Sequence, residues 1–340
     1  MSNKNQKEKQ SRSGLLLFLF SAITALLAAG LVFSLKWGQA PVSWRTLYEA
    51  VTYQGHDKAH LYIQTLRLPR ALTACMVGIQ LALAGLLTQL ATRNPLASPH
   101  IFGINAGAAL AVVFGIVTFA NISVLGSILF AFFGAAGGAL LVWGLAGTGQ
   151  NSFRRMALAG ITIHFLLSAL TEGLVLLNQE STDSMIFWLV GSLSQASWLD
   201  VRMLIPFLAG GLLLFGFMLP SFRLLQFEDD VAAGLGGRVA VIRGTSVLLV
   251  IVLAGSAVAL CGPIGFICLI VPHIARALVG SDLAALAPLT GLLGGALLVF
   301  ADFASRFIAF PYESPVGIVT SAIGAPFFLY LARLKGGAAS

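Results

Sequence analysis

Charge is what this sequence has least of. Asp, Glu, Lys and Arg make up only 10% of its 340 residues, whereas 58% of the residues are hydrophobic. Residues 14–35 contain no formally charged side chain, and about 20 such residues are enough for a helix to cross the hydrocarbon core of a bilayer. Together with a mean hydropathy of +0.91, this composition excludes a soluble domain and indicates a multi-pass membrane protein.

Several motifs that carry chemistry are also missing. None of the lysines follows a glycine, so the chain lacks the Gly-Lys-Ser/Thr ending of a phosphate-binding loop and does not bind ATP by that device. Cys75, Cys261 and Cys268 lie in apolar segments without the spacing of metal ligands. Because no Ser-His-acid or metal cluster is visible, we predict no catalytic residue and no metal site. Transport of a solute against its gradient by such a chain would need energy from an ion gradient or from a separate ATPase subunit.

The hydrophobic segments are continuously apolar and do not alternate every second residue, which favours helices over a barrel. We predict an all-α membrane protein with a short tail at 1–13 and one transmembrane domain at 14–335. Basic residues number thirteen on one side and seven on the other, so the positive-inside rule places both termini in the cytoplasm. The net charge of +7 then reflects the basic residues that orient the helices in the membrane, and it indicates no nucleic-acid partner. The expected spans are 14–35, 69–91, 99–119, 124–146, 156–178, 199–219, 244–262, 264–280, 285–304 and 316–334.

The loop at 220–243 is the longest that this topology places in the cytoplasm. Its acids precede a short stretch at 231–235 that a Gly-Leu-Gly-Gly run stops, and acids at the start with glycine at the end are typical of a short helix. We predict that this helix fits a groove on a partner; the alternative is a solvated connector. The residues assigned to this contact are Asp229, Asp230, Ala233, Leu235 and Gly236.

The fifth expected span carries polar side chains at helical spacing. His164, Ser168 and Glu172 recur every four residues and therefore share one face. A carboxylate at bilayer depth costs about 2.5–3.5 kcal/mol on insertion scales, so this face is expected to line a cavity or meet a partner. Interhelical hydrogen bonds are the alternative. One histidine and one glutamate do not make a metal-ligand set.

Several short sequence motifs occur in a fixed order, and their combination is highly specific. They are RLPR at 67–70, RNPLASP at 93–99, LAG at 158–160, GPIGFICLIVPHIAR at 262–276, Asp302-x-x-x-Arg306 and ESPVGIVTSAIGAPFFLYL at 313–331. On the basis of these motifs, the chain resembles the membrane permeases of bacterial ABC importers for iron–siderophore complexes, haem and cobalamin. The resemblance implies a pair of identical or homologous ten-helix permeases in the inner membrane. It also implies two ATPase subunits, which carry ATP and Mg, and a periplasmic substrate-binding protein.

The resemblance also implies roles for individual residues. Gln89 matches a position that faces the conduit, and Asn94 and Leu96 match positions that narrow its cytoplasmic end. Asn94 alone would also fit an Asn-Pro turn at a helix end. The docking positions for glutamates of the binding protein correspond to Arg67, Arg70 and Arg306; the alternative is that these arginines anchor helix ends at the membrane interface.

We therefore expect a non-enzymatic permease subunit that moves an iron(III)–siderophore chelate from the periplasm to the cytoplasm. Haem and cobalamin permeases share the same motifs and remain alternatives. An ion-coupled secondary transporter would need a titratable relay at the membrane midplane, for which Glu172 is the sole clear candidate. The Pro- and Gly-containing breaks at 93–107 and 262–273 are expected to lie against protein or a water-filled path, where their freed backbone groups can be paired.

Overall fold

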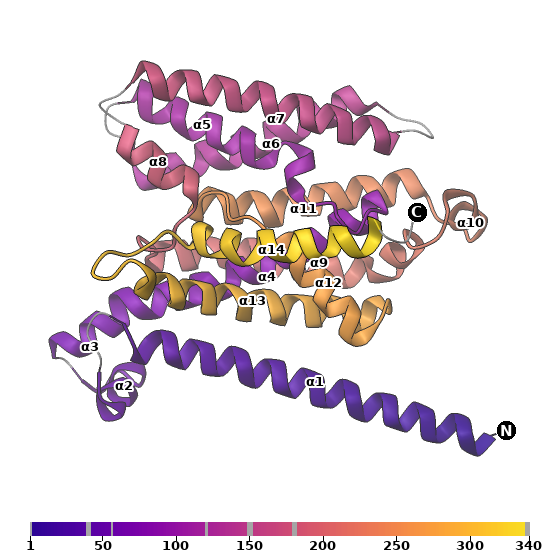
Figure 1. The fold of residues 1–340 in the computed structure, drawn as a ribbon, viewed down its shortest axis with the longest axis horizontal. Helices are drawn as coiled ribbons and strands as arrows, with labels where there is room; N and C mark the ends of the chain where they lie inside the picture. The colour runs from indigo at the N-terminus through magenta and orange to yellow at the C-terminus, as the bar shows by residue number, and fades with distance from the viewer. Residues whose placement is uncertain are drawn as a thin grey trace.

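The computed structural model describes residues 2–38, 42–55, 57–119, 122–147, 152–178 and 182–336. Within these ranges every regular element is a helix, as the continuously apolar segments predict. The long helices run side by side along one axis and form an elongated bundle (Figure 1). They are α1 Ser2–Lys36, α4 Leu68–Thr92, α5 Ile104–Thr118, α6 Val124–Ala146, α7 Ser152–Leu177, α9 Trp198–Leu224, α11 Val239–Cys261, α12 Ile267–Val279, α13 Leu283–Ile308 and α14 Val316–Gly336.

Each of these helices corresponds to one expected span. Seven helical stretches in the described chain are long and apolar enough to cross a membrane, while α5, α12 and the apolar part of α14 are shorter. The nearly continuous pair expected at 244–262 and 264–280 is separated by a break between α11 and α12, where Gly262 and Phe266 both adopt positive φ. The short elements are α2 Trp44–Val51, α3 Lys58–Tyr62, η1 Ile63–Arg67, η2 Pro99–Phe102, α8 Thr182–Val190 and α10 Asp229–Gly234.

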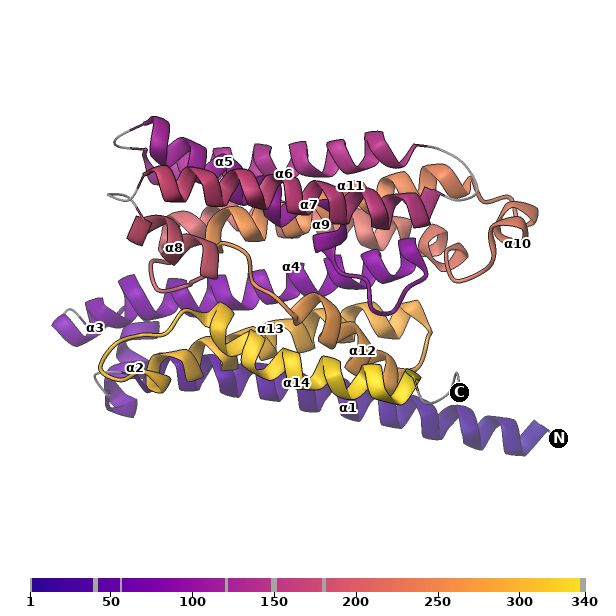
Figure 2. The same ribbon diagram turned by 45° about the horizontal axis from the view of Figure 1, so that its top comes forward.

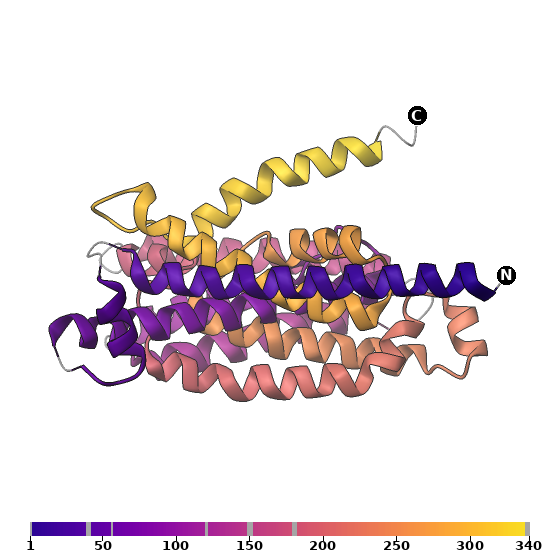
Figure 3. The same ribbon diagram turned by 90° about the horizontal axis from the view of Figure 1, so that it is seen from below.

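The two ends of the bundle carry different short elements. Figures 1 and 2 show α2, α3 and α8 at one end, while α10 lies at the other end with the start of α1 and the end of α14. Helix α7 forms an outer edge of the bundle beside α5 and α6. Helix α14 diverges from its neighbours toward its C-terminal end (Figure 3). Much of α7 and α14 is therefore left without a neighbour from the described chain.

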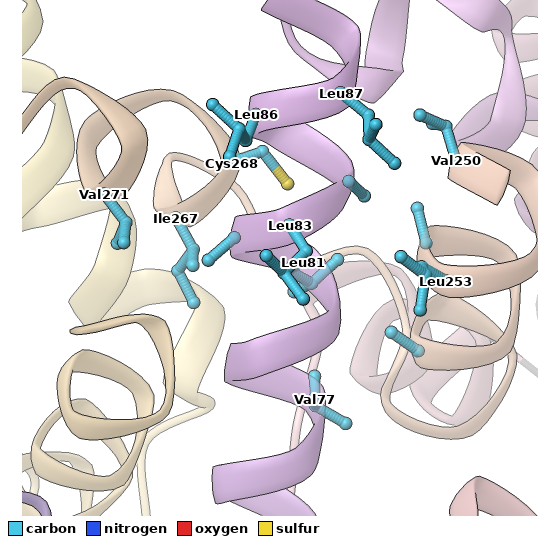
Figure 4. Close-up of a cluster of buried hydrophobic side chains, with 14 of the residues drawn as sticks. Val77, Leu81, Leu83, Leu86, Leu87, Val250, Leu253, Ile267, Cys268 and Val271 are labelled. Atoms are coloured by element: carbon cyan, nitrogen blue, oxygen red, sulfur yellow. The ribbon is translucent and has the colours of Figure 1, made fainter. Parts of the chain in front are cut away.

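Helix α4 lies at the centre of the bundle, and nearly all of its side chains are buried. Lipid is as apolar as leucine, so packing of small residues and close shape fit hold such helices together. Gly78 faces the backbone of Gly294 in α13, and Gly85 faces the carbonyl oxygen of Cys268 in α12; a Cβ atom at either glycine would overlap these atoms. Figure 4 shows side chains of α4 between those of α11 and α12: Leu81, Leu83, Leu86, Leu87, Val250, Leu253, Ile267, Cys268 and Val271.

Candidate functional site

Helix α7 presents three distinct faces. Ile163, Leu167 and Thr171 are buried against the bundle. His164 and Glu172 are exposed on a second face, with Ser168 half-buried between them, as their spacing predicts. Glu172 also borders a groove of about 300 Å³ toward Leu189 of α8.

The remaining face of α7 is apolar and exposed: Leu166 is 53% exposed and Leu170 is 50% exposed. Lipid can cover this face, but it cannot solvate the Glu172 carboxylate on the other exposed face. The polar face must therefore meet water or another polar surface.

The residues assigned to the cytoplasmic constriction divide into two groups. Asn94 is exposed after the end of α4, and its Oδ1 accepts a hydrogen bond from the backbone N–H of Leu96 at 2.9 Å. This is the local turn that an Asn-Pro pair favours. Leu96 is half-buried beside it, so both residues lie on the loop that breaks the helical run.

Gln89 is not part of that loop. It is only 3% exposed, its amide donates to the carbonyl of Leu269 at 3.3 Å, and its Oε1 accepts from Arg276 at 3.3 Å. In this subunit the Gln89 side chain is buried between α4 and α12, and its role at the conduit stays a prediction. A buried amide needs such partners, and the sequence alone did not indicate them.

The helix expected at 231–235 exists and begins two residues earlier, as α10. Glu228 precedes its first turn, which contains Asp229 and Asp230, and Gly236 follows it with a φ of 82°. Acids at the helix N-terminus and a glycine with positive φ beyond its end account for the boundaries of this short element.

The outer surface of α10 is exposed. Val231 is 49% exposed and Leu235 is 62% exposed, while Ala232 is fully buried beneath them. Ala233 and Gly236 share the exposed surface. A protruding helix with bare apolar side chains is suited to bind a groove on another protein.

Asp229, also predicted to contact a partner, has a side chain that is 41% exposed and that bonds within the chain. Its carboxylate accepts two hydrogen bonds from Arg243 in α11, at 2.7 and 2.8 Å, and also binds Arg93 at the end of α4. The hydrogen bonds from Arg243 are the largest cause that holds the pKa of Asp229 below its ordinary value. The carboxylate is therefore ionised at physiological pH, and these bonds are lost as the pH falls through that lowered pKa.

The arginines predicted to dock the binding protein are buried. Arg67, Arg70 and Arg306 are 3, 8 and 4% exposed. Arg67 donates to the carbonyl of Leu35 at 2.8 Å, where α1 ends. The structure buries these side chains within the subunit, and their role in docking the binding protein stays a prediction.

Asp302 explains why two of these arginines are held inside. It is 1% exposed and accepts from Arg306 at 2.6 Å and from Arg70 at 3.0 Å. Arg70 also binds Glu313 at 2.6 Å, and Arg306 donates to the carbonyl of Ser34 at 2.8 Å. These bonds join α1, α4, α13 and the segment before α14. The four-residue spacing of Asp302 and Arg306 was the one sequence signal for this cluster.

A bundle of apolar helices with a polar outer face on α7 and an exposed short helix at one end defines a multi-pass membrane protein of the transporter class. The profile of the FecCD transport family matches residues 26–334. The chain therefore belongs to the FecCD transport family, as the sequence motifs predicted.

Individual relatives agree with the family match. The chain is 42% identical over 326 residues to the Fe(3+)-citrate import system permease protein YfmD of Bacillus subtilis (strain 168), covering 96% of this chain and 97% of that protein. It is 38% identical over 309 residues to the Fe(3+) dicitrate transport system permease protein FecD of Escherichia coli (strain K12), covering 91% and 96%. A solved metal-chelate type ABC transporter in an inward-facing conformation matches with a TM-score of 0.81 and 31% identity, over 93% of this chain and 98% of that chain.

The first testable prediction concerns the buried carboxylate. Asp302→Asn keeps the side-chain shape but removes the charge that pairs with two buried guanidinium groups. Breaking a buried ion pair on one side typically costs about 3–5 kcal/mol, so the purified variant should unfold at a clearly lower temperature. Arg45→Gln is the control, because Arg45 pairs with Glu49 on the surface with a side chain that is 87% exposed. Equal melting temperatures for the two variants would contradict the structural role.

Proposed function

We propose that this chain is the permease subunit of an ATP-driven importer that carries an iron(III) chelate into the bacterial cytoplasm. Family membership supports a transport role, and the names of its relatives favour ferric citrate or siderophore chelates over haem and cobalamin. The observation that carries the ATP-driven part is α10, which presents bare Val231 and Leu235 at one end of a chain that lacks a phosphate-binding loop. Such a chain needs a separate subunit to hydrolyse ATP.

The proposed topology has ten spans and places α10 and both termini on the cytoplasmic side of the bacterial inner membrane. The positive-inside count supports this orientation. Among the three shorter helices, α5 follows η2 after Gly103, whose φ of 70° separates the two elements. The periplasmic binding protein would then dock at the end that carries α2, α3 and α8.

The proposed path lies between this chain and a second copy or a homologous permease. Helix α7 supplies its wall, because His164 and Glu172 are exposed on one polar face with Ser168 half-buried between them. Asn94 and Leu96 would narrow the cytoplasmic end of that path. The chain itself binds no cofactor in this proposal; ATP and Mg are held by two ATPase subunits, whose movement α10 receives through Asp230, Ala233, Leu235 and Gly236.

Uptake by a strain that lacks this gene tests the proposed cargo. Cells supplied with radiolabelled iron bound to citrate, to a hydroxamate or to a catecholate should lose uptake of at least one chelate and regain it from a plasmid copy. Haem and cobalamin uptake should be unchanged. Loss of haem or cobalamin uptake with normal uptake of all ferric chelates would reassign the cargo.

A second prediction tests α10 as the ATPase dock. Leu235→Asp or Ala233→Asp places a charge on its apolar surface and should weaken ATPase binding by about 2 kcal/mol or more, as at the centre of an interface. Co-purification of the ATPase measures this loss. Leu61→Asp is the matched control, because Leu61 is 50% exposed on α3 at the opposite end. If all three variants retain the ATPase equally, α10 is not the dock.

A third prediction tests the wet face of α7. In a background without the native cysteines, His164→Cys, Ser168→Cys and Glu172→Cys should react with a membrane-impermeant, water-soluble thiol reagent. Leu166→Cys and Leu170→Cys should react poorly although both positions are exposed in the isolated subunit, because they lie on the opposite side of the helix and face lipid. Stronger labelling of positions 166 and 170 would show that the water-exposed side of α7 is the opposite one, and the prediction would be wrong.

A further inference from the structure

Three segments that are far apart in the sequence meet at one carboxylate near the end of the bundle that carries α10. Asp229 lies in the first turn of α10, Arg93 ends α4, and Arg243 belongs to α11. Arg243 binds both carboxylate oxygens, at 2.7 and 2.8 Å, and Arg93 binds one of the same oxygens. A guanidinium that binds both oxygens of a carboxylate fixes direction as well as distance. We call these three residues the Asp229 cluster.

Arg93 is a constrained member of the cluster. Its φ of 49° puts a non-glycine residue in the left-handed region, a backbone state that persists where surrounding bonds determine it. Its side chain supplies such bonds, because Nε donates to the carbonyl of Leu225 at 3.3 Å while the end of the guanidinium binds Asp229. The next residue, Asn94, forms the turn with Leu96. A displacement of the Arg93 side chain would therefore act directly on the proposed constriction.

The other side of the cluster reaches the ATPase surface. Val231 in α10 and Leu235 just after its end are exposed. The Asp229 carboxylate is 41% exposed and binds the two arginines. A push on the outer face of this six-residue helix moves Asp229 with it, because a single short helix has no internal joint.

We propose that Asp229 is a positioning residue that transmits movement of α10, through Arg93, to the turn at 94–96. Asp229 touches neither cargo nor nucleotide; it links the dock to the constriction. This inference rests on the proposed function for the statement that an ATPase moves α10. The connection between α10 and the end of α4 stands on the bonds of the Asp229 cluster.

The test uses the complete transporter in proteoliposomes and measures chelate moved per ATP hydrolysed. Arg93→Gln removes the ion pair that links Asp229 to the constriction, while Arg243 still binds Asp229 and holds α10 in place. The ATPase should therefore stay bound and hydrolyse ATP. Chelate moved per ATP should fall about tenfold, within the usual range for coupling between two sites. Asp229→Asn should show the same fall.

Arg223→Gln is the matched control. Arg223 also pairs with an aspartate near α10, since it binds Asp282 at 3.3 Å with a side chain that is 48% exposed. Its partner Asp282 lies at the start of α13 and not in the 93–96 segment, so its loss should leave chelate moved per ATP unchanged. If the effect came only from a general weakening of surface ion pairs, chelate moved per ATP would fall equally in all three variants, and the proposal would be wrong.

A second readout follows the constriction itself. With Asn94→Cys in a background without native cysteines, reaction with a soluble thiol reagent should change when vanadate traps the nucleotide, and adding Arg93→Gln should abolish that change. Normal coupling and a normal labelling response in Arg93→Gln would overturn the proposal. Loss of assembly in Asp229→Asn together with full coupling in Arg93→Gln would overturn it too, since Asp229 would then only hold the loop in place. If the unmodified transporter moves no chelate with ATP, the proposed function fails, which is a different result.

Discussion

A bilayer offers no water to an unpaired backbone group, and this constraint shapes the whole molecule. It requires long continuous helices and allows them to break only where protein can cover the break. The two breaks beside the core, after α4 and between α11 and α12, lie against other helices of the bundle. The same constraint applies to charge: Arg70 and Arg306 are buried, and Asp302 pairs with both of them.

Helix α4 connects two ends of different character. At its start, Arg70 and Arg306 pair with Asp302, and these buried charges join α4 to α13. At its end lies Arg93, in a partly exposed cluster next to the turn at 94–96. Buried paired charges suit a fixed support. At the other end, Arg243 binds both carboxylate oxygens of Asp229 and ties α10 to α11. In the proposed importer, movement of α10 reaches the turn at 94–96 through this cluster.

The positions of the long helices were predictable from the sequence, because a helix long enough to cross the hydrocarbon needs an unbroken apolar run, and residues 14–35 and 124–146 are such runs. The sequence also placed α10 and the polar face of α7, since both depend on local spacing. It did not indicate the bonding partners of Arg67, Arg70 and Gln89. Their positions near helix ends were visible, but their partners lie in other helices, as Asp302 does for Arg70 across 232 positions. The bonds of Asp229 to Arg93 and Arg243 were hidden for the same reason.

In the proposed importer, ATP hydrolysed by a partner subunit drives the chelate through this permease, and an ion gradient does not. Proteoliposomes that hold the permease with its ATPase, internal Mg·ATP and external binding protein loaded with radiolabelled ferric chelate test it most directly. We expect the label to accumulate inside, to stop when ATP or the ATPase is omitted, and to continue when the proton gradient is collapsed. Accumulation by the permease alone under an imposed proton gradient, with no dependence on ATP, would contradict the account and give Glu172 the role of a proton carrier.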